Sequence, residues 1–265
     1  MSRVHAECSG QGRPIVFWHG WGLNLRVFDG LRAALDDAWQ TTAVDLPGHG
    51  RSDWDPEPLP AALLDTLPRG ATLVGWSLGG QLALRAAALA PERVARLVLI
   101  STTPRFVRTE EWLHGVEAKL LTQMRTRLLL DYRGTVDDFL SLQVRGSRSA
   151  AAVQAALRGA LLEHGAAQPA ALDAGLAALE STDLRPLLAS IRAPALVIAG
   201  QYDRVTPPGA GAALAAALPR ARGIELARAG HAPFLSHLPE LLPALRRFLA
   251  GAGPGGAVPA EAVPA

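Results

Sequence analysis

The stretch LVGWSLGGQLAL at residues 73–84 constrains the fold more than any other part of the sequence. An apolar run leads into Gly75-Trp76-Ser77-Leu78-Gly79, and a helix-like run follows at once. A G-x-S-x-G turn between a strand and a helix exposes its serine at the carboxyl end of a sheet, and its glycines let the strand and the helix approach closely. The stretch therefore predicts a nucleophilic serine, with an ordinary turn serine as the alternative.

Short apolar runs recur along the chain and end at polar or glycine-containing turns. They occupy residues 14–18, 41–44, 71–74, 97–100, 195–199 and 223–226. Continuous apolar runs without alternation are typical of strands buried on both faces of a parallel sheet. Helical stretches at 80–89 and 209–218 lie between such runs. The pattern predicts an α/β fold, with a mostly parallel central sheet flanked by helices.

The strand signals stop between residues 103 and 184, where the sequence is helical in character. We expect helices at 110–130, 136–143, 149–164 and 167–179. This predicts a helical cap, residues 104–184, inserted between strands of a core formed by 1–103 and 185–250. The Gly/Ala/Pro-rich tail 251–265 has no large side chain to anchor it, so we expect it to be disordered.

Composition excludes several classes of protein. No run of about 18 apolar residues is present, and the first ten residues lack the apolar core of a secretory signal. A net charge of +2 over 265 residues gives no nucleic-acid footprint. The single cysteine, Cys8, rules out an internal disulfide and fits a reducing compartment. We therefore expect a cytoplasmic protein that binds neither membrane nor nucleic acid.

A serine nucleophile needs a base, and the base needs a carboxylate that orients it. His231 follows the last apolar run at a Gly-His turn, and Asp203 follows the run before it. Ligands of an open parallel sheet bind beyond the carboxyl ends of its strands, which is where all three residues fall. The chain order Ser77, Asp203, His231 therefore predicts a catalytic triad.

The other histidines have different expected roles. His5, His114 and His164 lie in polar or helical contexts, and we expect them at the surface. His19 is interpreted as a residue that braces its loop. The loop 45–53, DLPGHGRSD, is expected to shape the fold without taking part in chemistry.

An acyl-transfer reaction also requires hydrogen-bond donors for the developing oxyanion. The amide of Leu78, directly after the nucleophile, should be one donor. The second should come from the loop His19-Gly20-Trp21-Gly22, where Trp21 is best placed. Such a reaction needs no metal and no organic cofactor.

The combined segments make the chain similar to the α/β-hydrolase superfamily over about residues 12–250. Within it, the sequence most resembles the pimeloyl-[acyl-carrier protein] methyl ester esterases of biotin synthesis. This closer resemblance rests on HGWGLN at 19–24, GWSLGG at 75–80 and FLSLQ at 139–143. It implies a monomeric serine carboxylesterase that forms an acyl-enzyme and releases methanol. The substrate-binding residues that it implies are Trp21, Ser77, Leu78, Phe139, Leu140, Ser141, Leu142, Gln143 and His231.

The resemblance also implies a transient partner, an acidic acyl-carrier protein that delivers the substrate. Residues 119–158 hold seven basic and three acidic side chains, which would attract such a partner. The positions expected to contact it in the family are Gly134, Asp138, Ala151 and Ala155, and none of these is basic. The candidate docking residues are instead the nearby arginines Arg133, Arg145, Arg148 and Arg158.

Other functions share the same motifs. A general carboxylesterase or lactonase for small esters would use the same triad without a carrier protein. A C–C bond hydrolase acting on vinylogous diketones also uses a serine triad. From a different class, a ligand receptor on a hydrolase scaffold can retain the triad with little turnover. Haloalkane dehalogenases and epoxide hydrolases of this fold are discounted, because they place an aspartate where Ser77 stands.

Overall fold

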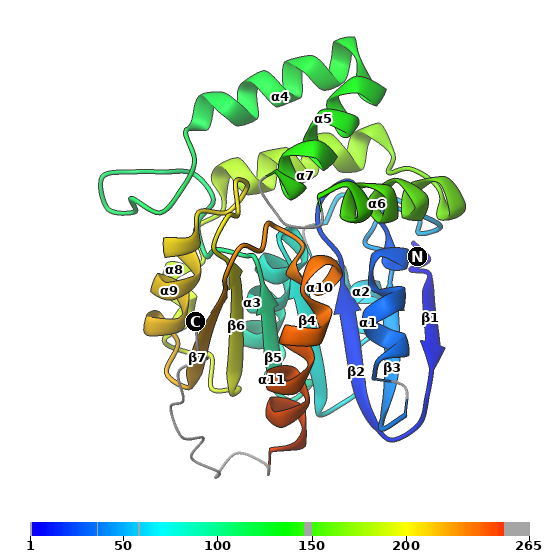
Figure 1. The fold of residues 1–265 in the computed structure, drawn as a ribbon, viewed down its shortest axis with the longest axis vertical. Helices are drawn as coiled ribbons and strands as arrows, with labels where there is room; N and C mark the ends of the chain where they lie inside the picture. The colour runs from blue at the N-terminus through cyan, green and yellow to red at the C-terminus, as the bar shows by residue number, and fades with distance from the viewer. Residues whose placement is uncertain (1, 36, 58, 146–149, 252–265) are drawn as a thin grey trace.

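A computed structural model describes residues 2–35, 37–57, 59–145 and 150–251. Seven strands of this described part form one sheet in the order β1-β3-β2-β4-β5-β6-β7 (Figure 1). All neighbours are parallel except β1, which runs antiparallel to β3. The strands are β1 (Ala6–Ser9), β2 (Arg13–Trp18), β3 (Trp39–Val44), β4 (Ala71–Trp76), β5 (Val94–Ile100), β6 (Ala195–Gly200) and β7 (Ala221–Leu226). The predicted α/β fold is confirmed, and only the half-exposed edge strand β1, which has no apolar run, lacked a sequence signal.

Helices cover both faces of the sheet (Figure 1). Helices α1, α10 and α11 lie in front of the sheet in this view, and α2 and α3 lie behind it. The core helices are η1 (Leu25–Phe28), α1 (Asp29–Ala33), α2 (Ala61–Leu64), α3 (Leu78–Leu89), α8 (Arg185–Leu188), α9 (Pro208–Ala217), α10 (Pro233–Ser236) and α11 (Leu238–Ala250). Alternate residues of each strand point to opposite faces, so each face buries its own apolar cluster.

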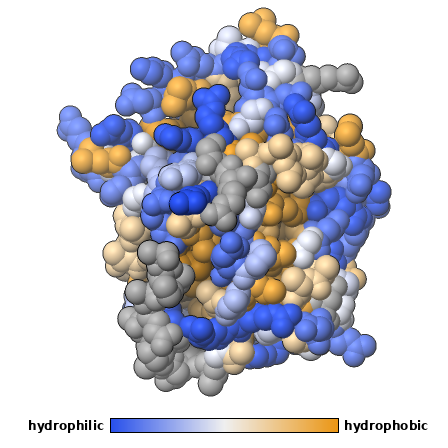
Figure 2. All heavy atoms as spheres, viewed as in Figure 1, coloured by the Kyte–Doolittle hydropathy of each residue, from blue (hydrophilic) through white to orange (hydrophobic). Residues whose placement is uncertain are grey.

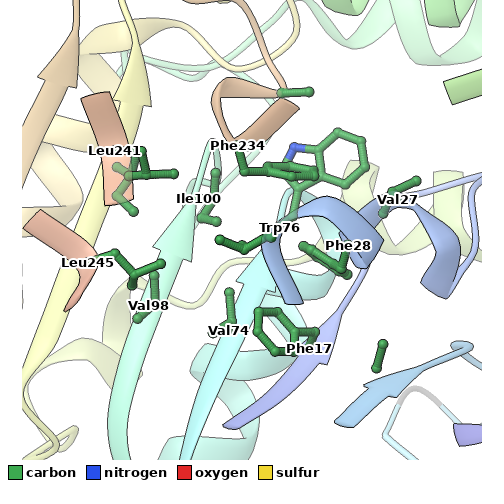
Figure 3. Packing of buried hydrophobic residues seen from close by; sticks show 14 of the residues in the cluster. Phe17, Val27, Phe28, Val74, Trp76, Val98, Ile100, Phe234, Leu241 and Leu245 are labelled. Carbon is green, nitrogen blue, oxygen red and sulfur yellow. The ribbon is translucent and has the colours of Figure 1, made fainter. Parts of the chain in front are cut away.

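Aromatic side chains pack at the carboxyl end of the front face (Figure 3). The ring of Trp76 meets that of Phe234 at 5.1 Å between centroids, and Phe28 lies 5.1 Å from Phe234 and 5.2 Å from Phe17. All four side chains are fully buried, and each contributes roughly 2–3 kcal/mol of transfer free energy. Trp76 immediately precedes Ser77, so this cluster fixes the end of β4.

Four helices form the cap between β5 and β6, above the carboxyl ends of the strands (Figure 1). They are α4 (Ala118–Leu130), α5 (Tyr132–Val144), α6 (Ala150–His164) and α7 (Pro169–Ser181). The two ends of the insertion meet at its base. The Leu184 amide donates to the Pro104 carbonyl at 2.9 Å, and Arg105 Nη1 donates to Asp183 Oδ2 at 2.7 Å.

The helix expected at 110–130 begins only at Ala118, so its first part was wrongly predicted. Residues 105–117 form an irregular loop whose main chain pairs with itself. The Arg108 amide donates to the Val116 carbonyl at 2.8 Å, and the Val116 amide donates to the Phe106 carbonyl at 2.9 Å. These pairs use backbone groups that a helix would need, and they outweigh the local helical pattern.

The remaining expectations concern membrane association, the single cysteine and the C-terminal tail. In the described part of the chain, no helix is both long and apolar enough to span a bilayer. Cys8 is a free, exposed thiol on β1. The tail that was expected to be disordered lies outside the described residues from 252 onward.

Candidate active site

Ser77 occupies a sharp turn between β4 and α3. Its backbone has φ 55° and ψ −118°, a conformation that a residue with a side chain rarely adopts. The Ser77 amide donates to the Ile100 carbonyl at 3.0 Å, which holds the turn against β5. A Cβ atom on Gly75 would lie 2.5 Å from the Gly79 carbonyl oxygen, and one on Gly79 would lie 2.2 Å from the oxygen of Trp18. Both positions therefore require glycine, and together they let the chain expose Ser77.

Asp203 and His231 follow β6 and β7, and the structure brings their side chains together. Asp203 Oδ2 lies 2.8 Å from His231 Nδ1, and both side chains are 1% exposed. The other carboxylate oxygen of Asp203 accepts the amides of Val205 and Thr206, each at 2.8 Å. A carboxylate held in this way keeps the imidazole proton on Nδ1, which leaves Nε2 as the basic nitrogen of the neutral ring.

The Nε2 atom of His231 is buried and has no hydrogen-bond partner among the described residues. The main chain of this histidine is fixed from two sides. The Trp76 indole donates to the His231 carbonyl at 2.8 Å, and the His231 amide donates to the Gln143 carbonyl of the cap at 2.9 Å. Within the described chain the Ser77 hydroxyl makes no hydrogen bond to His231, a bond that often tightens only when substrate binds.

Two main-chain amides lie beside the nucleophile. Leu78 is the first residue of α3, and Trp21 lies in the loop after β2. In the described part of the chain neither amide donates a hydrogen bond. The loop is close to the nucleophile, because a Cβ atom on Gly20 would lie 3.2 Å from Ser77 Cβ. The Trp21 indole donates to the Leu172 carbonyl of α7 at 2.9 Å, which anchors the side chain to the cap.

Two buried histidines support this loop. His19 Nε2 accepts the Leu46 amide at 2.9 Å, and its Nδ1 lies 2.8 Å from the Gly20 carbonyl. His49 Nε2 accepts the Gly22 amide at 3.3 Å. Burial lowers the pKa of His19 to about 4 and that of His49 to about 3, so both rings are neutral acceptors near neutral pH. The bracing role expected for His19 fits these contacts.

A pocket of about 1010 Å³, which includes its open mouth, leads to Ser77 beneath the cap. Its lining is mostly apolar and comes from both the core and the cap. The apolar lining residues are Trp21, Phe106, Val116, Leu120, Leu121, Met124, Phe139, Leu142, Leu176, Leu179 and Val205. Polar side chains, among them Arg127, Asp138 and Arg204, also contribute to the lining. Sequence reasoning missed the contributions of α4 and α7, because a helical pattern does not say which face meets the site.

The cap segment 139–143 has only two side chains in the pocket. Phe139 and Leu142 are three residues apart on α5, so they share the face that meets the pocket. Phe139 also packs edge-on against Trp21, at 5.2 Å between ring centroids. Leu140 is buried in the core cluster of the front face, and the Ser141 hydroxyl bonds within the cap. Gln143 contributes its main-chain carbonyl to His231, while its buried side chain does not line the pocket.

Of the four candidate docking arginines, the structure describes the side chains of Arg145 and Arg158. Arg158 Nε lies 3.1 Å from Asp137 Oδ1 across α5 and α6, and Arg145 is exposed at the end of α5. Arg133 lies in α5, and Arg148 lies outside the described residues. The cap surface at the top of Figure 2 is mostly hydrophilic with separate apolar spots. Part of the positive charge seen in the sequence is therefore already paired with acidic side chains.

Comparisons with known proteins identify the family of the chain. The alpha/beta hydrolase fold family matches residues 13–238. The chain is 42% identical over 240 residues to a pimeloyl-[acyl-carrier protein] methyl ester esterase of Nitrosomonas europaea, covering 89% of this chain and 95% of the relative. It is 44% identical over 255 residues to the protein of that name from Stenotrophomonas maltophilia, covering 95% and 98%. A bromoperoxidase structure from Bacillus anthracis superposes with a TM-score of 0.85 at 22% identity, covering 94% and 96%, and shares the fold.

Proposed function

The chain belongs to the alpha/beta hydrolase family, and from this premise we propose that it is a serine carboxylesterase acting in biotin synthesis. Its reaction is the hydrolysis of pimeloyl-[acyl-carrier protein] methyl ester to pimeloyl-[acyl-carrier protein] and methanol. The observation that carries the proposal is the buried Asp203–His231 pair. Its Nε2, which has no partner among the described residues, lies at the same sheet edge as the strained Ser77 turn. The names of relatives at 42–44% identity over most of the chain support the substrate.

In the proposed reaction, Ser77 Oγ attacks the ester carbonyl carbon while His231 Nε2 takes its proton. The amides of Trp21 and Leu78 hold the oxyanion, and each such donor lowers the barrier by roughly 3 kcal/mol. The C–O bond to the methoxy group breaks, and methanol leaves with the proton from His231. Water then attacks the acyl-enzyme with His231 again as base, and the free carboxylic acid is released. Asp203 stays ionised and keeps His231 in the required tautomer.

The pocket fits the acyl chain of this substrate. Phe139, Leu142 and the apolar side chains of α4 and α7 would pack along the methylenes, with the methyl ester at Ser77. The carrier protein would remain outside the mouth, against cap arginines such as Arg145 and Arg158. We further propose that the chain is a cytoplasmic monomer and that its carrier partner binds transiently. Small esters would be weaker substrates.

The test is growth of a biotin auxotroph that lacks this esterase activity. Wild-type protein should restore growth without biotin, and Ser77→Ala should not, although the variant keeps the wild-type thermal midpoint. Purified wild-type protein should turn over methyl pimeloyl-carrier protein with a higher kcat/KM than p-nitrophenyl acetate. Rescue by Ser77→Ala would overturn the mechanism. Turnover of small esters without rescue would reassign the chain to the general esterases or lactonases.

A further inference from the structure

His164 departs from the expectation of a surface histidine. It ends α6, and its side chain is fully buried against the core. Its Nε2 lies 2.7 Å from Asp45 Oδ2, and the Asp45 side chain is also 0% exposed. Asp45 further accepts the amides of Leu25 and Arg51, each at 2.9 Å, so its position is fixed. No local pattern indicates this contact, because 119 residues separate the two partners.

The second ring nitrogen of His164 is the unusual feature. Nδ1 is buried and has no hydrogen-bond partner in the described part of the chain. Because the hydrogen bond to the Asp45 carboxylate places a proton on Nε2, the neutral ring carries a free lone pair at Nδ1. A buried nitrogen in this state is costly unless a further group satisfies it.

Two more potential ligands surround this histidine. One ligand atom each of His5, Glu7 and His164 lie within 4.8 Å of one another. His5 Nε2 is 3.3 Å from Glu7 Oε1, and the rings of His5 and His164 are 5.2 Å apart between centroids. Ligand atoms bound tetrahedrally to Zn²⁺ at about 2.0–2.1 Å lie roughly 3.3 Å from each other. The His5–Glu7 pair already has this spacing.

We propose that His5, Glu7 and His164 form a binding site for Zn²⁺ at the joint between the core and the cap. Two histidines and one glutamate are a ligand set that zinc takes in proteins, with water in the fourth position. Asp45 completes the arrangement, because a ligating histidine normally donates its other ring N–H to a carboxylate or carbonyl. The ion would fasten the end of α6 to the chain segment that includes β1.

The charge that competes for this site is Arg26. Its guanidinium contacts Glu7 Oε1, and it also lies 3.5 Å from Asp29 Oδ2, to which it can move when Glu7 binds an ion. Arg26 therefore competes with the ion for Glu7 and limits the affinity of the site.

The site is separate from the ester chemistry. None of its ligands belongs to the Asp203–His231 pair, the Ser77 turn or the lining of the pocket that leads to Ser77. Zinc is therefore expected to stabilise the attachment of the cap and to leave the turnover of small esters unchanged. The zinc site and the proposed esterase function are independent, so either one can fail its test while the other holds.

The test is isothermal titration of Zn²⁺ into the full chain, untagged and stripped with a chelator. Wild-type protein should bind one Zn²⁺ per chain and gain thermal stability on binding. Glu7→Gln and His164→Gln should each weaken binding at least about 10-fold. The glutamine amide at 164 can keep a hydrogen bond to Asp45 without offering the ring nitrogen. Arg26→Gln should bind more tightly, because it removes the competing charge.

His114→Gln is the matched control, since it removes an exposed histidine outside the cluster and should leave binding unchanged. A wild-type dissociation constant above about 1 mM would overturn the proposal. Wild-type affinity in Glu7→Gln would also overturn it. Glu7 is partly exposed, so this variant is expected to fold even where His164→Gln does not. Co²⁺ supplies an independent readout, because intense visible bands are expected for the four-coordinate ion and should disappear in Glu7→Gln.

Discussion

The carboxyl edge of the sheet and the helical cap both face the pocket, but different kinds of interaction hold each of them in place. At the sheet edge, Asp203 and His231 are 1% exposed, and the bonds that orient them from Val205, Thr206 and Trp76 are buried. In the cap, the Arg125–Asp173 pair is 35% and 65% exposed, and such pairs contribute little to stability. The described part of the cap meets the site mainly through apolar side chains, together with the bonds from the His231 amide to the Gln143 carbonyl and from the Trp21 indole to the Leu172 carbonyl. From this difference we expect the core to determine the chemistry and the cap to select the acyl group.

Asp203→Asn should have the largest effect, because it changes the buried Asp203–His231 pair of the core. The asparagine amide can donate to His231 Nδ1, which places the imidazole proton on Nε2 and removes the base. We expect kcat for p-nitrophenyl acetate to fall about 10⁴-fold with little change in thermal midpoint. Asp173→Asn, at an exposed aspartate of the cap that does not line the pocket, is the control and should change kcat less than about 2-fold. A loss below 10-fold in Asp203→Asn would remove Asp203 from the triad.

Acid should destabilise the core through two buried histidines, His19 and His49. The pKa of His19 is lowered to about 4 and that of His49 to about 3, so the unfolded chain binds these protons first. Their stabilisation is complete above about pH 6.5 and is lost as pH falls toward these folded-state values. The loss is on the order of 3 kcal/mol for His19. Urea unfolding followed from about pH 7 to pH 4 should show the decline, and a flat profile would contradict the buried, neutral assignment.

The core and the cap also differ in how far the sequence predicts them. Buried strands are mostly apolar runs, so β2 to β6 could be located, and the run 223–226 located β7, although this edge strand is only partly buried. Polar residues at the strand ends indicated Ser77, Asp203 and His231. The cap helices could be placed only approximately. Periodicity alone does not show that Phe139 meets the pocket while Leu140 faces the core. Contacts such as His164–Asp45 join segments far apart in the chain and leave no local pattern.

Gly230→Ala tests the bond between the His231 amide and the Gln143 carbonyl, which links the core to the cap. A Cβ atom on Gly230 would lie 2.7 Å from the Gln143 carbonyl oxygen, a main-chain atom that cannot move alone. The substitution should separate the end of α5 from His231 and lower kcat by up to about 100-fold. Gly159→Ala is the matched control within the cap, because a Cβ there meets nothing within 4 Å. Equal rates for both variants would show that the cap does not position His231.

Shortening the pocket wall should have the smallest effect and the most selective one. Phe139→Ala removes apolar contact with the acyl chain, so kcat/KM for six- to eight-carbon esters should fall about 10-fold, with acetate nearly unchanged. Leu142→Ala lines the same face without a ring contact to Trp21, so it separates lost acyl contact from a shifted Trp21. Leu129→Ala, on a residue that is 85% exposed, should behave as wild type. Equal losses for short and long esters in both pocket variants would mean that the cap supports the chemistry as well as selecting the substrate.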